Sequence, residues 1–298
     1  MDPFPFATQK QLSELKDSPC HADETRWQVF ILTEGKSGYR QYLWVFRTPS
    51  ATYYVLDPTR SASVPFAHFK TVEDRIIIVC GSSRAYKSLA KQGGVLLAFC
   101  WAHVRRDFLN VVKGWPALSG WGMAWVEHIG RLYPLNHQRL GVLDQPALFA
   151  ECDARLRAQV QAMARHRDEQ LADPSLPITV KKTRKSLQNH WQGLTLFVDY
   201  PLVPMDNNAG EQALRTPVVG RKNYDGSGSL WSGDLAAMLF TVLMTMTHWE
   251  INPRRWLTEY LRVCAANGNQ PPEDLTPHLP WAMNETHLAS LRALADTS

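Results

Sequence analysis

Apolar runs separated by polar turns divide the first sixty positions into short segments. Trp27–Thr33, Tyr39–Arg47 and Thr52–Leu56 are rich in aromatic and β-branched residues, and a turn at 34–38 joins the first two. Runs of this composition, joined by a short glycine-containing loop, are typical of a β-hairpin. The pattern therefore predicts an antiparallel meander of three strands.

The next forty positions change character. Arg75–Cys80 and Val95–Trp101 are continuous apolar runs, as expected of strands buried on both faces. A short helix is expected near 60–69, and a second at Ser83–Lys91, where Gly93 and Gly94 end it. Strands that alternate with helices after a meander predict an α/β fold with a mixed sheet.

Beyond His103 the pattern is helical. Helical periodicity occurs at 126–136, 146–165 and 187–190, which predicts an all-helical insertion. Residues 194–200 are predicted to be extended, and helices are predicted at 235–249 and 253–265. The predicted parts are an N-terminal remnant (1–19), a first core part (20–103), the insertion (104–193), closing core helices (194–265), and a proline-rich linker with a C-terminal segment (266–298).

Composition restricts the class of protein. The chain has 298 residues, a net charge of +4 and five scattered cysteines without a CxxC pair, which favours reduced thiols in a cytoplasm-like compartment. No apolar signal segment opens the sequence. The apolar run 235–247 is short and ends in polar residues, so no membrane partner is expected.

The most informative stretch is MDNNAGEQALRTPVVGRKNY, residues 205–224. Its Asp and Asn residues can cap a helix, Glu211 follows in the first turn, and Arg215 lies four residues later. Gly220 with Arg221 and Lys222 is predicted to break that helix with a basic turn. A helix carboxylate beside a basic loop suits a metal-dependent site on nucleic acid; the same residues also fit a capped surface helix with a Glu–Arg pair.

Asp23 is a second candidate acid, expected just before the first strand. Together with Glu211 it could share a hard cation such as Mg²⁺, which prefers carboxylate, water and phosphate oxygens. Glu24 is the alternative, but neighbours on a strand point to opposite faces, so only one of them can serve. Cys100-x-x-His103 lacks a second ligand pair for zinc.

Two basic clusters are candidates for phosphate contact. Arg105 and Arg106 follow His103, and residues 181–185 read KKTRK. Both clusters also fit solvated helix surfaces, so they leave the question of nucleic-acid binding open.

Several blocks in fixed order resemble transposases of the insertion sequence 66 family. They are HADETRW (21–27), YLWVF (42–46), CWAHVRRDF (100–108), DNNAGEQALRTPVVGRKN (206–223), GSGSLWSG (226–233), NPRRWLTEYL (252–261) and LPWAMNE (279–285). The resemblance covers nearly the whole chain from residue 19. It implies a ribonuclease-H-like fold with an Asp–Asp–Glu metal triad, interrupted by a helical insertion.

The resemblance implies that Asp23 is the first acid and Glu211 the third, both as catalytic residues and as metal ligands. The second acid should follow the RIIIVC strand, where this chain has Gly81. Asp74 lies at the opposite end of that strand, about 20 Å away at ~3.3 Å per residue. Asp107 lies beyond a different strand. We therefore expect a catalytically impaired site.

The family resemblance also implies function and partners. DNA strand cleavage and transfer at insertion-sequence ends is expected, with Mg²⁺ or Mn²⁺ if the site works. DNA contacts are expected from His103, Arg105, Arg106, Arg215, Arg221 and Lys222. Homo-oligomers, other transposition proteins and a cytoplasmic, nucleoid-associated location are implied as well.

Two alternatives stay open from the sequence. One is a non-catalytic DNA-binding or dimerising remnant that modulates an intact transposase; the other is a nuclease of the same fold. Because few residues precede Asp23, the chain is also expected to lack the N-terminal DNA-binding and zinc-binding regions of longer relatives.

Overall fold

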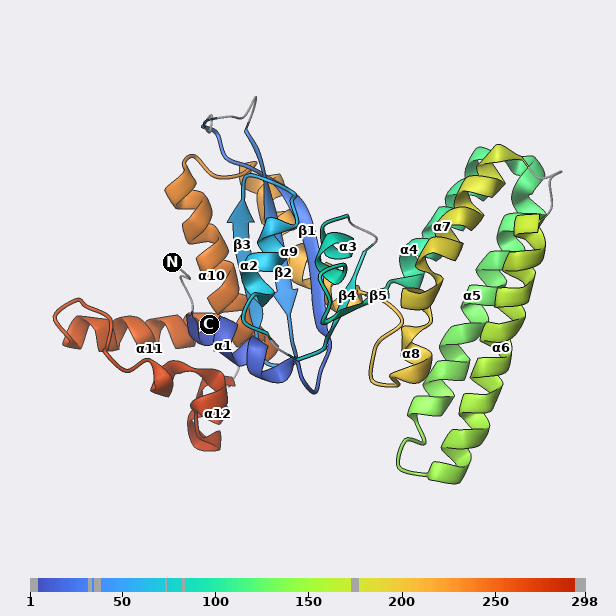
Figure 1. Ribbon diagram of the computed structural model, residues 1–298. Coiled ribbons are helices and arrows are strands. Elements are labelled where there is room, and N and C mark those ends of the chain that lie inside the picture. The colour runs from blue at the N-terminus through green and yellow to red at the C-terminus, as the bar shows by residue number, and fades with distance from the viewer. Residues whose placement is uncertain are drawn as a thin grey trace, which may run out of the picture. The chain divides into compact units, whose positions relative to one another are not determined.

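A computed structural model describes residues 5–31, 34, 39–72, 74–81, 84–172 and 177–292 (Figure 1). The predicted turn at 34–38 falls mainly outside the described residues. The chain forms two compact units: one comprises Met1–Asp17, Asp23–Arg60 and Ala209–Ser298, and the other Ser18–Ala22 and Ser61–Asn208. For brevity they are called the acid unit and the bundle unit.

Five strands form one mixed sheet in the order β3-β2-β1-β4-β5. They are β1 (Cys20–Gln28), β2 (Arg40–Arg47), β3 (Thr52–Asp57), β4 (Ile76–Cys80) and β5 (Val95–Phe99). β2 and β3 are antiparallel, whereas β1–β4 and β4–β5 are parallel. This arrangement confirms the predicted α/β class and its mixed, ribonuclease-H-like sheet.

The prediction for the first strand was wrong. The apolar run 27–33 was expected to be the strand, but β1 begins at Cys20 and ends at Gln28. Its core-facing positions include Cys20, Ala22 and Trp27, which are buried between polar neighbours. The small and polar composition of CHADET hid this strand, and Asp23 consequently lies within it rather than before it.

In the acid unit, a core forms between the strands and two helices, α9 (Asn208–Tyr224) and α10 (Leu230–His248). Trp27, Leu43 and Tyr54 are buried there with Leu214 and Ala237. The Ser229 and Ser232 side chains form a reciprocal capping box at the start of α10. These side chains place β1, β2, β3, α9 and α10 around one hydrophobic core.

Helix α10 covers the edge of the sheet that β3 forms. The Thr241 hydroxyl accepts a hydrogen bond from the Tyr54 N–H (2.9 Å), and the Thr245 hydroxyl bonds both the N–H and the carbonyl of Thr52 (3.1 and 3.2 Å). An edge strand otherwise presents unpaired backbone groups. The threonines in this apolar helix therefore complete the hydrogen bonding of β3.

By length and composition α10 is apolar enough to cross a membrane. One face of this helix nevertheless packs along β3, and its Thr241 hydroxyl bonds to that strand's backbone (Figure 1). The expectation that this segment does not span a bilayer agrees with this packing.

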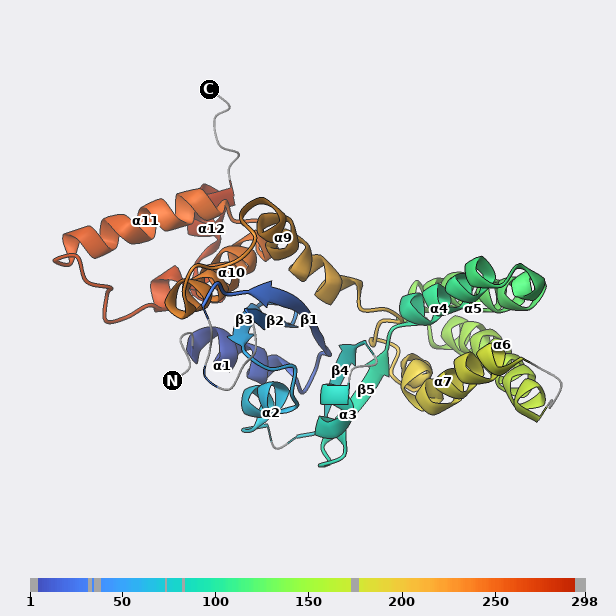
Figure 2. The ribbon, with the colours of Figure 1, turned by 90° about the horizontal axis from the view of Figure 1, so that it is seen from above.

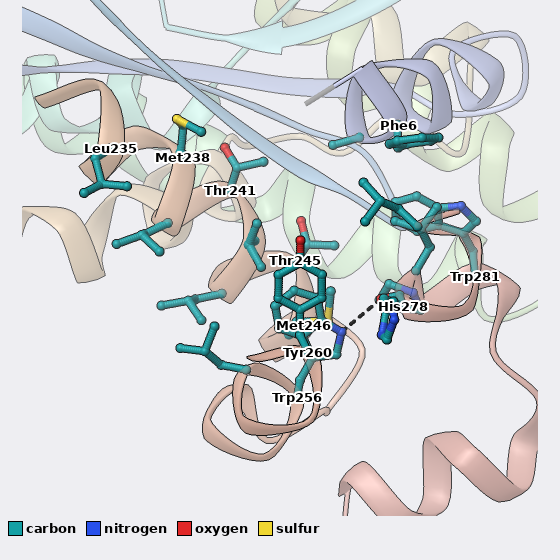
Figure 3. A pocket seen from close by; sticks show the side chains of 18 residues that line it. Phe6, Leu235, Met238, Thr241, Thr245, Met246, Trp256, Tyr260, His278 and Trp281 are labelled. Carbon is teal, nitrogen blue, oxygen red and sulfur yellow. Dashed lines mark hydrogen bonds between the residues drawn. The ribbon is translucent and has the colours of Figure 1, made fainter. Parts of the chain in front are cut away.

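The described part of the acid unit contains further helices. They are α1 (Pro5–Glu14), α11 (Pro253–Ala266), α12 (Glu285–Arg292) and the short 3-10 turns η2 (Thr276–His278) and η3 (Pro280–Ala282). The Gln11 side chain donates to the carbonyls of Phe46 and Ala51, so α1 is tied to the meander. An apolar cavity of about 320 Å³ lies among α1, α10, α11 and residues 275–281, where the Trp256 indole donates to the His278 carbonyl (Figure 3).

In the bundle unit, the short helices α2 (Ser63–Phe69) and α3 (Arg84–Ala90) accompany β4 and β5. Four long helices then run side by side (Figures 1 and 2). They are α4 (Trp101–Gly114), α5 (Ser119–Leu140), α6 (Pro146–Ala172) and α7 (Ile178–Leu194), with the turn η1 (Pro116–Leu118) before α5. The predicted helical character of this region is confirmed, although its helices are longer than expected.

Aromatic residues build the bundle core. Phe108 stacks on Trp125 at 5.4 Å between ring centroids, and the Trp121 and Trp125 indoles both donate to Gln170 Oε1 at 3.0 Å. Residues 194–200 were expected to be extended, but Leu196–Asp199 forms the short helix α8, which buries Phe197.

Candidate metal site

Helix α9 begins at an Asx turn, because Asp206 Oδ1 accepts a hydrogen bond from the Asn208 N–H at 3.0 Å. Glu211 lies in the first turn. Arg47 on β2 donates to the Ala209 carbonyl (3.2 Å), and the Tyr54 hydroxyl on β3 donates to the Ala213 carbonyl (2.5 Å). Two neighbouring strands therefore hold the backbone on both sides of Glu211.

The predicted basic turn at Gly220 was wrong. α9 continues through Gly220 and ends at Tyr224, so Arg221 and Lys222 belong to its last turn. A Cβ at Gly220 would come within 2.6 Å of the Tyr224 hydroxyl oxygen. The glycine thus makes room for the Tyr224 ring four residues later instead of ending the helix.

Asp23 is a partly buried carboxylate near the middle of β1. Burial is the main cause that raises its pKa to about 7; the nearby Glu24 and Glu211 carboxylates raise it further, while the Glu24 N–H and Arg60 lower it. The N–H of Glu24 donates to Asp23 Oδ1 at 2.9 Å. Glu211 is therefore close enough to Asp23 to oppose its ionisation.

Glu24 has a different partner. The Arg60 guanidinium contacts Glu24 Oε1 through Nε at 2.6 Å and Nη2 at 2.5 Å, and the Glu24 side chain is only 2% exposed. This ion pair engages the Glu24 carboxylate. Of the two neighbouring acids, Asp23 is the better candidate to act with Glu211.

The donor set fits a hard divalent cation. A carboxylate such as Asp23, whose ionised form is opposed by burial and by neighbouring carboxylates, is stabilised when a cation binds beside it. Carboxylate oxygens are the ligands that Mg²⁺ and Mn²⁺ prefer. Asp23 and Glu211 would hold the ion, and its remaining positions would accept water and phosphate oxygens.

Asn207 fixes the chain segments that lead to both acids. It is fully buried; its side-chain amide donates to the Ala22 carbonyl at 3.0 Å, and its Oδ1 lies 2.9 Å from His21 Nδ1. Ala22 directly precedes Asp23, and Asn207 is four residues before Glu211. Sequence analysis treated Asn207 only as a possible helix cap, yet its side chain has a positioning role.

Gly81 directly follows β4. Ala22 and Cys80 are the last partners in the β1–β4 register; Asp23 is the next residue of β1, and Gly81 is the first residue after β4. A Cβ built on Gly81 meets no atom within 4 Å, so an aspartate would fit sterically. Asp74 precedes β4 and lies at its other end, as expected.

The predicted basic residues lie on two helices. In the acid unit, α9 carries Arg215 and Lys222, which are exposed, and Arg221, which is partly buried. In the bundle unit, α4 carries the partly buried His103 and the exposed pair Arg105 and Arg106.

Asp107, which follows that pair on α4, has a pKa raised by burial, although His103, Arg106 and His190 lower it. Those three basic groups therefore lie near Asp107.

Sequence reasoning missed the residues that support the site. Arg47 and Tyr54 were included only in predicted strands, and Asn207 only among possible caps. Burial makes their hydrogen bonds important, because a buried polar group must find a partner. The sequence signal for Arg47 and Tyr54 is a polar group in or beside an apolar run, whereas Asn207 stands among other polar residues and carries no such signal.

Comparison with known proteins agrees with the fold. A family model described as "Transposase IS66 family" matches residues 5–235. The fold and this match together define a DDE transposase domain of ribonuclease-H-like architecture. The chain belongs to the IS66 family of transposases.

Two curated relatives are similar to most of the chain. Two proteins of Sinorhizobium fredii (strain NBRC 101917 / NGR234) are named uncharacterized protein y4jD and y4qI. They are 28% and 25% identical to this chain over 80% and 87% of its length. These matches cover 47% and 50% of the relatives, so the chain spans about half their length. No solved structure matches the chain.

Proposed function

We propose that this chain carries the catalytic centre for DNA strand cleavage and transfer at insertion-sequence ends, in an impaired form. The observation that carries the proposal is the Asp23–Glu211 pair, in which burial and neighbouring carboxylates raise the pKa of Asp23 to about 7. Within a DDE transposase family, such a pair supports a divalent-metal site.

The proposed chemistry is phosphoryl transfer. Hydrolysis breaks a P–O3′ bond of DNA, adds a water oxygen to phosphorus and releases a 3′-hydroxyl. In strand transfer that hydroxyl attacks a second phosphodiester, so a new O3′–P bond forms while the P–O3′ bond of the attacked strand breaks and releases its 3′-hydroxyl. A bound Mg²⁺ would neutralise phosphate charge and favour deprotonation of the attacking oxygen. Asp23 and Glu211 would bind the ion, and the six predicted basic residues would bind the DNA backbone.

Gly81 is the reason to expect impairment. A shared carboxylate holds the metals of a two-metal site in place, and glycine offers no ligand atom. Loss of one ligand weakens metal binding and the stabilisation of charge in the transition state. This residue also favours the second candidate function, a non-catalytic DNA-binding or dimerising remnant that modulates an intact transposase.

The test compares the unmodified chain with Gly81→Asp in DNA cleavage and strand transfer, with Mg²⁺ and with Mn²⁺. We expect feeble activity of the unmodified chain. Gly81→Asp should raise the rate at least about tenfold, which corresponds to ~1.4 kcal/mol of recovered transition-state stabilisation. Asp23→Asn combined with Gly81→Asp is the control and should abolish the gain. Robust activity of the unmodified chain, unchanged by Gly81→Asp, would contradict impairment.

A metal titration separates the two candidate functions. The catalytic proposal needs a divalent ion bound by Asp23 and Glu211. The remnant needs only DNA affinity that weakens with salt. Cleavage products with no joined products would instead favour a nuclease of the same fold.

A further inference from the structure

A polar pocket lies on the acid unit near the end of α9. Its volume is about 310 Å³, and it is lined by Arg26, Gln28, Arg221, Lys222 and Asp225. Three cations face one carboxylate, which gives the pocket a net positive charge. Arg26 and Gln28 were not candidates from sequence.

The walls of this pocket are fixed by backbone contacts. The Arg221 guanidinium donates to the Arg26 carbonyl and to the Thr25 hydroxyl. The Ser227 N–H donates to the Gln28 carbonyl at 2.9 Å, and the Ser227 carbonyl accepts from the Phe30 N–H at 2.8 Å. The last turn of α9 and the loop after it are thereby held against β1.

The loop after α9 requires a glycine at this contact. Gly226 has φ +152°, and a Cβ there would lie 2.2 Å from the Gln28 carbonyl oxygen. The Trp27 indole also donates to the Ser227 hydroxyl at 3.0 Å. A pocket with such constrained walls is organised before any ligand arrives, which lowers the entropic cost of binding.

The pocket cations are available to an external anion. Among the described residues, Arg26, Arg221 and Lys222 take part in no ion pair, and Arg26 and Lys222 are exposed. Asp225 also lines the pocket but balances only one of the three charges. Arginine and lysine that converge in this way suit a phosphate group.

Helix geometry relates this pocket to Glu211. Residues 211 and 222 are eleven apart, which is close to three turns at 3.6 residues per turn, so they lie on the same face of α9. Arg215 shares that face. At ~1.5 Å per residue, the two positions are about 16 Å apart along the helix, comparable to four or five steps of a DNA strand at ~3.4 Å each.

We propose that Arg26, Arg221 and Lys222 form a phosphate subsite that holds a DNA strand four or five nucleotides from the Asp23–Glu211 centre. The inference rests on the proposed function, because that function supplies the DNA. The strand would run along the α9 face from Glu211 past Arg215 to the pocket. The subsite binds the backbone and reads no base.

The test measures how the affinity for a fluorescent 30-base-pair duplex depends on NaCl. The double variant Arg26→Gln, Lys222→Gln removes two cations and spares Arg221, which bonds to the backbone of β1. The logarithmic salt slope should fall by about 1 to 2, since each phosphate contact contributes ~0.9. The matched control, Arg254→Gln with Arg262→Gln, removes two exposed cations from α11 and should leave the slope unchanged.

Two further experiments identify the ligand and separate the subsite proposal from the proposed catalysis. Millimolar inorganic phosphate should compete far less than an eight-nucleotide strand at equal phosphate concentration; equal competition would indicate a free-anion site and overturn the proposal. A wild-type salt slope in the double variant would overturn it as well. All salt slopes are measured in EDTA, where no metal ion at Asp23 can contact phosphate. A failed cleavage assay with the subsite effect present would contradict only the proposed catalysis.

Discussion

At the scale of single residues, burial and charge are in conflict at Asp23. Its carboxylate lies near Glu24 and Glu211, and only Arg60 and one backbone N–H favour its ionised form. Such a site is unfavourable in the metal-free protein and becomes favourable with a cation. The ionised Asp23 carboxylate is therefore expected to lower the stability of the metal-free fold.

The pH dependence of stability tests this conflict. In its folded state Asp23 has a pKa of about 7, above the ordinary value of 3.8, so the native state binds more protons than the unfolded state between these pH values. The free energy of unfolding in EDTA should therefore fall as pH rises from about 4 to about 7, at up to ~1.4 kcal/mol per unit. Asp23→Asn should flatten this slope and melt higher at pH 8; a variant that melts lower there would contradict the account.

Asn207 gives a second prediction at this scale. Asn207→Ala removes the hydrogen bond to the Ala22 carbonyl inside a buried site. We expect a loss of ~1–3 kcal/mol in the free energy of unfolding, measured in urea. Weaker Mn²⁺ binding should accompany it, because the segments before Asp23 and α9 lose their link. The exposed Asn223→Ala, on the same helix as Glu211, is the control and should change neither quantity.

At the scale of elements, the sequence predicted what strong patterns encode. β2 through β5 were found because aromatic and β-branched residues follow one another there. β1 was misplaced because CHADET alternates small and polar residues, and the helix end at Gly220 was wrong because packing against Tyr224 overrides the glycine signal. The family resemblance assigned Asp23 and Glu211 as acids of the site. The supporting roles of Arg47, Tyr54 and Asn207 could not be predicted, because they depend on hydrogen bonds between residues far apart in sequence.

Helix α10 offers a matched comparison of two threonines. Thr245→Val leaves the buried N–H of Thr52 without its side-chain partner, which should lower the free energy of unfolding by ~1–3 kcal/mol. Thr247→Val, in the same helix, alters an exposed hydroxyl that bonds only the Leu243 carbonyl. It should change stability by less than about 0.5 kcal/mol. Equal effects in urea unfolding would contradict the role of α10 as cover for the β3 edge.

The stability of the helical bundle should fall in mild acid. Burial lowers the pKa of His128, and His166 and Arg131 lower it further, against Glu127. Because the unfolded chain then binds more protons below about pH 6.5, stability should fall as pH drops from 7 to 5. Amide hydrogen exchange in α5 and α6 should accelerate over this range, and His128→Gln should reduce the acceleration. Exchange that is independent of pH, after correction for its intrinsic rate, would contradict this prediction.

At the scale of the whole molecule, the chain is an IS66-family transposase domain that spans about half the length of its curated relatives. Its acid unit contains both candidate metal ligands and the basic pocket, and its bundle unit contains α4 with His103, Arg105 and Arg106. The activity of a complete transposase, its DNA ends and its partners stay proposals for this chain.

The most direct test of the central claim is calorimetric titration with Mn²⁺ at pH 8, without DNA. The account predicts one site that is at least about tenfold weaker in both Asp23→Asn and Glu211→Gln, a loss of ~1.4 kcal/mol or more for each ligand. The site should be unchanged in the exposed control Glu127→Gln and tighter in Gly81→Asp. Binding that survives both ligand substitutions unchanged would show that Asp23 and Glu211 do not share a metal ion.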